Sequence, residues 1–216
     1  MRYLDLSHPI STDMMVNPFM PKPTLTAIID RDQSSSFLAP GVTCQMDRID
    51  VPGNTGTYLN APFQFHASSA DLAALPLERL VDVPIVIVSA PDTVEIGPEP
   101  FEAAGDLSGA AVLVHTGHDR HWGTSAFFKD SPYLSEAAVK TLIAAGPAMV
   151  GIDSQNLDNG SDNRKPAQHG LLGQDVYLLV SLKGLDRLPP RGARLTVLPT
   201  PMQRMGSFPV RVLAVA

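Results

Sequence analysis

Side chains that could bind a molecule or take part in a reaction are concentrated in one short stretch, 54-NTGTYLNAPFQFH-66. It contains two asparagines, a glutamine and a tyrosine at close spacing, and it ends on His66. Amides and phenols donate and accept hydrogen bonds, but they are neither good metal ligands nor strong nucleophiles. The stretch therefore predicts a place where polar side chains converge on a bound molecule.

Histidines elsewhere in the chain offer acid–base chemistry, because imidazole titrates near neutral pH. His169 lies in 166-PAQHGLL-172, and three more lie in 115-HTGHDRHWGT-124 together with Asp119. The second group is compatible with a metal site, although three histidines on a loop are more typical of solvated side chains. Trp122, in the same segment, is expected either to wall a site for a flat substrate or to pack in the core.

The composition limits the classes of protein that the chain can belong to. It has 216 residues, of which 44% are hydrophobic and 18% charged, enough for a large core. A net charge of −6 argues against nucleic acid as a partner. The single cysteine, Cys44, excludes an intrachain disulfide and is expected to be a small buried apolar residue. Because neither a signal peptide nor a membrane-length apolar run is visible, we expect a cytoplasmic protein with no membrane partner.

Hydrophobic patterns predict a mixed α/β domain. Continuous apolar runs at 83–90, 111–117 and 148–153 are typical of buried central strands. A helix is expected over 135–146, with Ser135 as its N-cap and Gly146 ending it. Further strands are expected at 2–10, 24–31, 44–51, 193–199 and 208–216, with a loop at 11–23, short helical turns between 68 and 80, and a polar loop, a lid or subunit contact, at 155–168.

Several segments, taken in order, resemble the bacterial cyclase family, which includes kynurenine formamidase and isatin hydrolase. The segments are 5-DLSHPI-10, 56-GT-57, 61-AP-62, 111-AVLVHTG-117, 149-MVGIDS-154, 166-PAQHGLL-172 and 206-GSFPVRVLAV-215. The resemblance implies one α/β domain over residues 1–216, with a swivelling β/β/α fold that forms a homodimer or homotetramer. It also implies hydrolysis of amides, lactams or lactones with one or two divalent metals.

The family's metal signature, HxGTHxDxPxH, is altered in this chain. Aligned on the shared Gly-Thr and Pro, and on the later histidine and glutamate, the six ligand positions are held by Asn54, Tyr58, Asn60, Gln64, His169 and Ser181. Only His169 keeps the family's residue. Divalent cations need carboxylates or imidazoles to offset dehydration, so these substitutions predict a site without metal, and no other cofactor is indicated.

The substitutions are all polar, which favours a repurposed pocket over a decayed one. We hypothesise a metal-independent hydrolase or cyclase/lyase acting on a small carbonyl compound of the amide, lactone or lactam type. His169 would act as general acid or base and Tyr58 would donate to a developing oxyanion. Contacts to the substrate are assigned to Asn54, Asn60, Gln64, Ser181, His66 and Trp122.

Two alternatives stay open on the sequence alone. One is a non-catalytic protein that binds a small molecule in the same pocket. The other is a metal-dependent hydrolase whose ligands are not recognisable from the sequence. On a strand, His66 would point to the same side as Gln64. Asp153 and Ser154 are expected to shape the floor of the pocket or the backbone.

Overall fold

The computed structural model describes all residues, 1–216, and its core is a mixed sheet of nine strands in the order β1-β13-β11-β5-β7-β9-β10-β4-β12. The strands are β1 (Tyr3–Asp5), β4 (Tyr58–Asn60), β5 (Val83–Ser89), β7 (Ala111–His115), β9 (Met149–Ile152), β10 (Tyr177–Val180), β11 (Arg191–Val197), β12 (Ser207–Pro209) and β13 (Val212–Val215). Strands β5, β7, β9 and β10 run parallel, and the outer strands pair antiparallel. The three apolar runs predicted as central strands are therefore confirmed as β5, β7 and β9.

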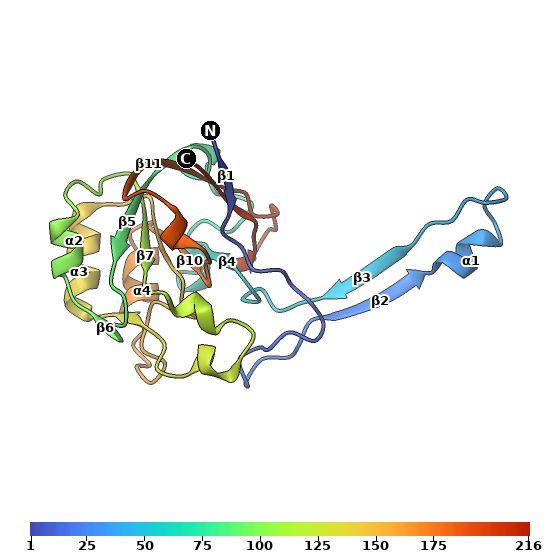
Figure 1. Cartoon of the computed structure of the whole chain (residues 1–216), viewed down its shortest axis with the longest axis horizontal. Coiled ribbons are helices and arrows are strands. Elements are labelled where there is room, and N and C mark those ends of the chain that lie inside the picture. The colour runs from blue at the N-terminus through green and yellow to red at the C-terminus, as the bar shows by residue number, and fades with distance from the viewer.

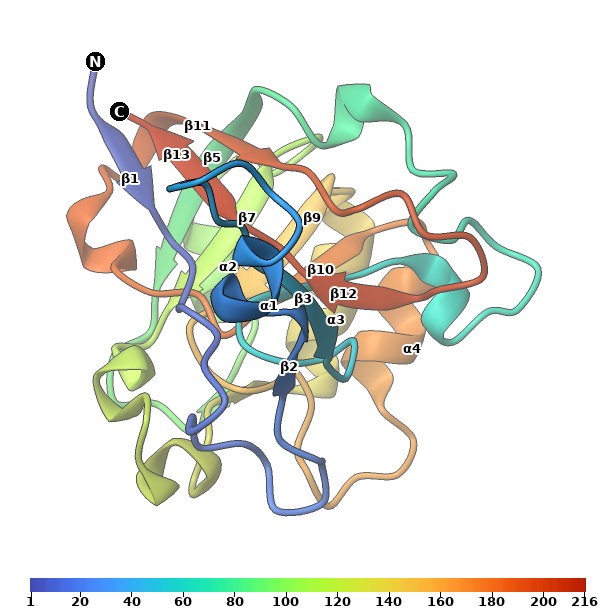
Figure 2. The ribbon, with the colours of Figure 1, turned by 90° about the vertical axis from the view of Figure 1, so that its right-hand side faces the viewer.

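Helices cover one face of this sheet. They are α2 (Glu99–Ala103), α3 (Glu136–Ala145) and α4 (Pro166–Leu172), and they lie together on one side of the molecule in Figure 1. Side chains alternate along each strand, so one apolar cluster forms beneath the helices and a second fills the opposite face of the curled sheet. Figure 2 shows the helices behind the sheet when the other face is turned to the viewer.

The helix predicted over 135–146 is confirmed as α3. The Ser135 side chain accepts a hydrogen bond from the Ala138 backbone amide at 3.1 Å, which satisfies one of the free amides of the first turn. Gly146 ends the helix with a φ of 64°, a left-handed conformation that other residues adopt only at a cost.

The remaining elements are short. Two two-strand sheets are formed by β2 (Thr24–Ile29) with β3 (Met46–Asp50) and by β6 (Glu95–Ile96) with β8 (Tyr133–Leu134). One more α-helix, α1 (Arg31–Ser35), connects β2 to β3, and single 3₁₀ turns occupy Pro62–Gln64, Leu77–Arg79, His118–His121, Ser125–Phe128 and Leu185–Arg187. None of these helices is long and apolar enough to cross a bilayer.

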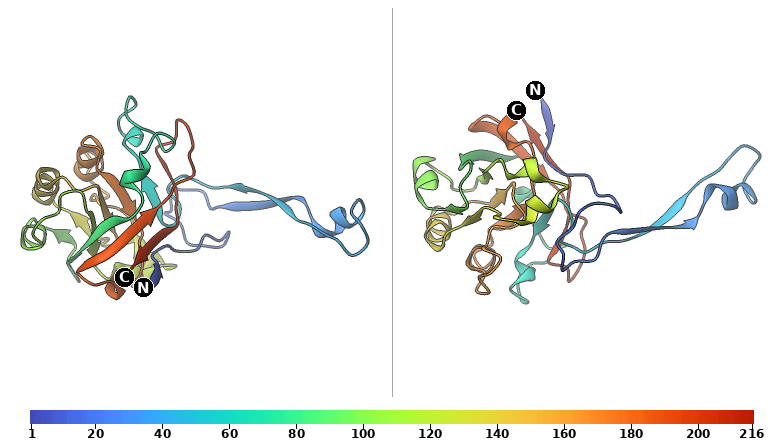
Figure 3. Two further views of the ribbon diagram at one scale, coloured as in Figure 1. Left: turned by 90° about the horizontal axis from the view of Figure 1, so that it is seen from above. Right: turned by 60° about the horizontal axis from the view of Figure 1, so that its bottom comes forward.

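A long arm, residues 24–50, projects from the body and consists of β2, α1 and β3 (Figures 1 and 3). The sequence predicts both strands but not their position away from the core. Cys44 lies on this arm and is only half-buried, so the expectation of a buried cysteine is wrong. The cysteine has too few neighbours there for full burial, because the arm has no second layer to pack against.

The arm exposes large apolar side chains to solvent. Leu25 and Ile49 are paired across the two strands, and each is 56% exposed. A two-stranded hairpin is marginally stable alone in water, so exposed apolar residues on one are typical of a surface that another chain covers.

We therefore expect the arm to support self-association. Replacing Leu25 and Ile49 by glutamate should shift the protein from an oligomer to a single chain, because burying unpaired charge in the contact is costly. Sedimentation velocity measures the mass, and replacing Thr24 and Thr26 by glutamate, which adds the same two negative charges to the same hairpin, is the matched control. An unchanged mass in the Leu25 and Ile49 variant would contradict this expectation.

Candidate functional site

The segment that attracted attention in the sequence forms β4, between β10 and β12. Tyr58 lies opposite Val180 and Asn60 lies opposite Leu178 in the antiparallel register. Because side chains alternate, Tyr58 and Asn60 point to the helix-covered side, whereas Leu59 points into the cluster on the other face. The spacing of the Tyr-x-Asn pair thus places both polar side chains on one side of the sheet.

Buried hydrogen bonds connect the ends of β4, β10 and β9. The Thr57 hydroxyl donates to the Ser181 carbonyl at 2.5 Å, and it accepts from the His8 amide at 2.9 Å. The Ser181 amide donates in turn to the carbonyl of Ser154 at 2.8 Å. Ser181 has a φ of 55°, in the left-handed region, which these bonds hold in place.

Asp153 fixes the segment that follows β7. Its fully buried carboxylate accepts from the Thr116 amide at 2.9 Å, from the Thr116 hydroxyl at 2.5 Å and from the Gly117 amide at 2.8 Å. Burial raises the pKa of this carboxyl above its ordinary value, while the three donors act in the opposite direction. The expectation that Asp153 shapes the backbone around the pocket agrees with these contacts.

A cavity of about 310 Å³ opens beside these strand ends. Its volume is in the range of small-molecule sites. Four segments and Ser181 contribute its lining residues; the segments are 14–20 of the first loop, 54–58, 122–128 and the loop 155–165. Its walls are rich in aromatic and methionine side chains, namely Met14, Met15, Phe19, Met20, Tyr58, Trp122, Phe127 and Phe128.

Four of the residues that we selected from the sequence line this cavity. They are Asn54, Tyr58, Ser181 and Trp122. Burial alone raises the pKa of Tyr58 well above its ordinary value, because no charge or hydrogen bond of the protein offsets desolvation of the phenolate. Tyr58 is therefore a protonated hydrogen-bond donor at neutral pH, and it cannot act as a base there.

Asn60 and Gln64, also selected from the sequence, do not line the cavity. Asn60 is fully buried, and neither its Oδ1 nor its Nδ2 has a hydrogen-bond partner in the protein. The Oε1 of Gln64 is also buried without a partner. Buried polar groups are nearly always satisfied, so these amides require water or a ligand.

His66 and His169 lie together, away from the cavity lining. Their rings are 4.7 Å apart, and the His66 Nε2 is 2.9 Å from the His169 carbonyl oxygen. His169 is exposed on α4, whereas the preceding Gln168 is buried, because successive helical residues point about 100° apart. His66 does not lie on a strand, the condition under which it would point to the same side as Gln64, because Pro62–Gln64 form a 3₁₀ turn and the His66 amide donates to the Pro62 carbonyl.

His8 is a neighbour of the site that the sequence analysis did not select. Its ring stacks on the indole of Trp122 with 3.9 Å between centroids and 10° between planes. Its Nε2 is buried without a partner. Desolvation, with a smaller contribution from Lys183, lowers the pKa of His8 to about 4, so the ring is neutral at pH 7.

The segment with three histidines serves packing. His118 is buried, and its Nε2 lies 3.0 Å from the Phe127 carbonyl oxygen. Nowhere in the chain do three or more His, Cys, Asp or Glu side chains gather in a way that could hold a metal ion. Trp122 contacts Phe127 edge-on, with centroids 5.0 Å apart, so it both packs and faces the cavity.

The sequence analysis also missed Lys165 and the Met-rich loop at 14–20. Lys165 is the one charged side chain in the cavity lining. It occupies the end of the predicted polar loop, immediately before Pro166, and a Lys-Pro pair at a helix start is the only signal that marked it.

Comparison with known proteins identifies the family of the chain. The Cyclase family model matches residues 4–159, which is more than half of the chain. The chain belongs to the Cyclase family. The relatives that it matches are named as hydrolytic enzymes, which agrees with the enzyme expected from the sequence motifs.

Similar proteins match over nearly the full length. A kynurenine formamidase of Bordetella avium (strain 197N) is 27% identical over 215 residues, covering 98% of this chain and 97% of that protein. Isatin hydrolase A from Labrenzia aggregata, solved with benzyl benzoate, has a TM-score of 0.82 at 23% identity, covering 99% and 93% of the two chains. A second isatin hydrolase, bound to the product analogue thioisatinate, has a TM-score of 0.84 at 21% identity, covering 99% and 92%. The swivelling α/β fold of the cyclase type is thus confirmed.

The residues present do not fit the divalent metal that the family's signature implies. The cavity is lined by neutral amides and a protonated phenol, and neither a carboxylate nor an imidazole is among its lining residues. Asn60 adds a further reason: its neutral amide stands where the family's signature has a carboxylate, so it brings no negative charge to offset dehydration of a divalent cation.

Protein purified without chelator and challenged with zinc and manganese should therefore hold close to zero metal per chain. Elemental analysis after gel filtration measures the stoichiometry. One or two metal ions per chain would contradict the argument from the donor set, and replacement of His66 and His169 by alanine would then show whether these two histidines are the ligands.

A second expectation follows from the low pKa of His8. The pKa of His8 is lower in the folded chain than in the unfolded chain, so the unfolded chain binds a proton more readily. The free energy of unfolding is therefore unaffected by this group above about pH 6.5 and decreases as the pH falls toward about 4. After a discount for its partial exposure, we expect a loss of about 1 kcal/mol between roughly pH 7.5 and pH 5. Urea unfolding at both pH values, in wild type and His8→Gln, measures it. Equal pH dependence in the two proteins would rule out this role for His8.

Proposed function

We propose that the protein is a metal-independent hydrolase or cyclase of small aromatic carbonyl compounds, of the amide, lactam or lactone type. Membership of the Cyclase family supports the reaction class, and the names of its relatives, kynurenine formamidase and isatin hydrolase, describe hydrolytic enzymes. The observation that carries the proposal is Tyr58, a protonated donor in the wall of an aromatic cavity at the position of a lost metal ligand.

Tyr58 would stabilise the carbonyl oxygen as negative charge develops on it. In hydrolysis, water adds to the carbonyl carbon, the C–N or C–O bond breaks, and a proton of the water goes to the departing nitrogen or oxygen. A donor in a desolvated site stabilises the tetrahedral oxyanion more strongly than the neutral carbonyl, which lowers the barrier. The Ser181 hydroxyl and the Asn54 amide also line the cavity and would orient the substrate.

The aromatic wall supports a flat substrate. Trp122 stacks on the ring of His8 and meets the ring of Phe127 at 79°, so packing holds the indole as a rigid surface that lines the cavity. Stacking against such a surface is favourable for aromatic rings and costs little conformational entropy. Isatin and the formamide of kynurenine, known from the names of the relatives, are the first compounds to test.

One observation favours a second candidate function, the binding of such a compound without turnover. The cavity lining contains no histidine, aspartate or glutamate, which are the usual general bases. His169, proposed from the sequence as the base, does not line the cavity, so we assign it no contact with the substrate.

Two point variants test the assignment. Tyr58→Phe should lower kcat about 100-fold, since one oxyanion donor is worth roughly that factor, while thermal unfolding stays unchanged because the ring is kept. His169→Ala should keep kcat within about threefold, as expected of an exposed residue outside the cavity. Turnover of a panel of aromatic amides, lactams and lactones gives the rates.

The outcomes separate the candidates. Equal kcat in wild type and Tyr58→Phe would overturn the role of the phenol. A large loss in His169→Ala would return the base to that histidine. Binding of several compounds by calorimetry, with no turnover of any, would establish the second candidate and reject the first.

A further inference from the structure

The loop 155–165 brings one cation to the cavity. Lys165 ends this loop, and it lines the cavity together with Gln155, Asn156 and Gly160 of the same segment. Its backbone is in the left-handed region, with φ 48° and ψ 56°, directly before Pro166. A residue before proline avoids helical conformations, so the surrounding loop must hold this geometry.

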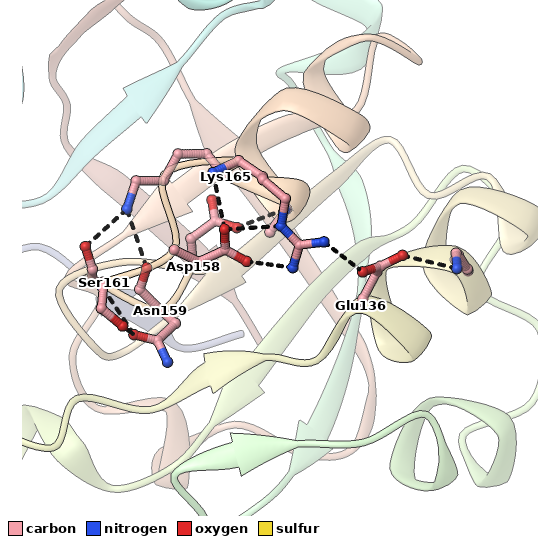
Figure 4. Close-up of polar contacts among 10 residues, drawn as sticks. Glu136, Asp158, Asn159, Ser161 and Lys165 are labelled. Atoms are coloured by element: carbon pink, nitrogen blue, oxygen red, sulfur yellow. Dashed lines mark hydrogen bonds and ion pairs between the residues drawn. The ribbon is translucent and has the colours of Figure 1, made fainter.

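The ammonium group is oriented by two carbonyls. The Lys165 Nζ donates to the carbonyl oxygens of Asn159 and Gly160, each at 3.1 Å (Figure 4). A lysine ammonium has three N–H donors, so one is left for a ligand. Neither contact neutralises the charge, because both acceptors are backbone groups.

The neighbouring cation, Arg164, is paired with carboxylates. Arg164 forms ion pairs with Asp162 at 2.8 Å and with Glu136, labelled in Figure 4, at 3.4 Å. Lys165 has no carboxylate within ion-pair distance. Of the two adjacent charges, only that of Lys165 is available to the cavity.

Asp158 lies near Lys165 but does not pair with it. Its carboxylate accepts from the backbone amides of Ala167 at 2.7 Å and Gln168 at 2.9 Å, which fixes the first turn of α4. Lys165 lowers the pKa of Asp158 through its charge, although desolvation dominates and raises that pKa overall. The carboxylate oxygens are thus occupied, and the ammonium keeps a free donor.

We propose that Lys165 binds a carboxylate carried by an aromatic ligand in this cavity, which makes it the residue that selects the charge of the substrate or product. The cavity offers stacking surfaces for the ring and this one cation for the anionic group. The net charge of the chain is −6, so attraction for an anion must come from the local group rather than from the whole surface. The proposal rests on the proposed function only in taking this cavity as the ligand site.

Two probes of matched shape test the proposal, 2-naphthoate and 2-naphthamide, which differ in charge and not in ring. Wild type should bind the naphthoate about tenfold more tightly, as expected for a charge-assisted hydrogen bond. Lys165→Gln should lose this preference while its affinity for naphthamide stays within about twofold. Lys165→Arg, which keeps the charge, should retain most of the preference, and Arg164→Gln is the control for a cation that faces outward.

Calorimetric titration of the whole protein gives the affinities, and thermal unfolding shows that each variant is folded. Equal affinity of wild type for the two probes, or an unchanged preference in Lys165→Gln, would overturn the role of Lys165. The result is independent of turnover. A naphthoate preference lost in Lys165→Gln, in a protein that hydrolyses nothing, would keep this inference and reject the proposed reaction. Turnover that depends on Tyr58, without any naphthoate preference, would do the opposite.

Discussion

A continuous set of buried hydrogen bonds across four strand ends holds the cavity. Asp153 after β9 binds the backbone at Thr116 after β7, Ser154 accepts from Ser181 after β10, and the Ser181 carbonyl accepts from Thr57 before β4. Each of these bonds is shielded from water, where breaking one costs more than at the surface. The positions of Tyr58, Trp122 and the backbone around Ser181 all depend on this set. These hydrogen bonds explain how the cavity can keep its shape although the residues of the family's metal signature have been replaced.

Replacement of the signature residues by amides changes what the cavity can bind. A metal site is organised around one positive centre, so its ligands are acceptors that converge. Asn60 presents a donor and an acceptor together, and both lack partners within the protein. A site of this kind is complementary to groups that are themselves bifunctional, such as amides, carboxylic acids and water. Catalysis in such a pocket has to rely on directed hydrogen bonds and on exclusion of solvent.

The sequence predicted those parts of the fold that depend on local patterns. The apolar runs of β5, β7 and β9 and the caps of α3 are such patterns, and the motifs 5-DLSHPI-10 and 149-MVGIDS-154 indicated the family. It could not predict which of Gln168 and His169 would be buried, because that depends on the rotation of a short helix against the sheet. The His8–Trp122 stack was missed because the two residues are distant in sequence. Lys165 was missed because its place in the cavity lining depends on how the loop 155–165 lies against the other lining segments. The position of the arm could not be predicted either, because a local pattern of apolar residues does not say whether a hairpin packs on the core or projects from it.

The arm has a consequence for how the molecule moves. The hydrogen bonds of residues 24–50 join only residues of the arm itself, through the β2–β3 ladder and short contacts such as Cys44 with Ser34. Such a segment can open as a separate unit without disturbing the main sheet, and its opening free energy is much smaller than that of the core. Its amide protons should exchange with solvent quickly in an isolated chain and slowly wherever another molecule covers it. The hydrogen-exchange rate of the arm's backbone amides therefore indicates whether the arm is covered by another molecule, and it can be measured while the amides of the parallel strands remain protected.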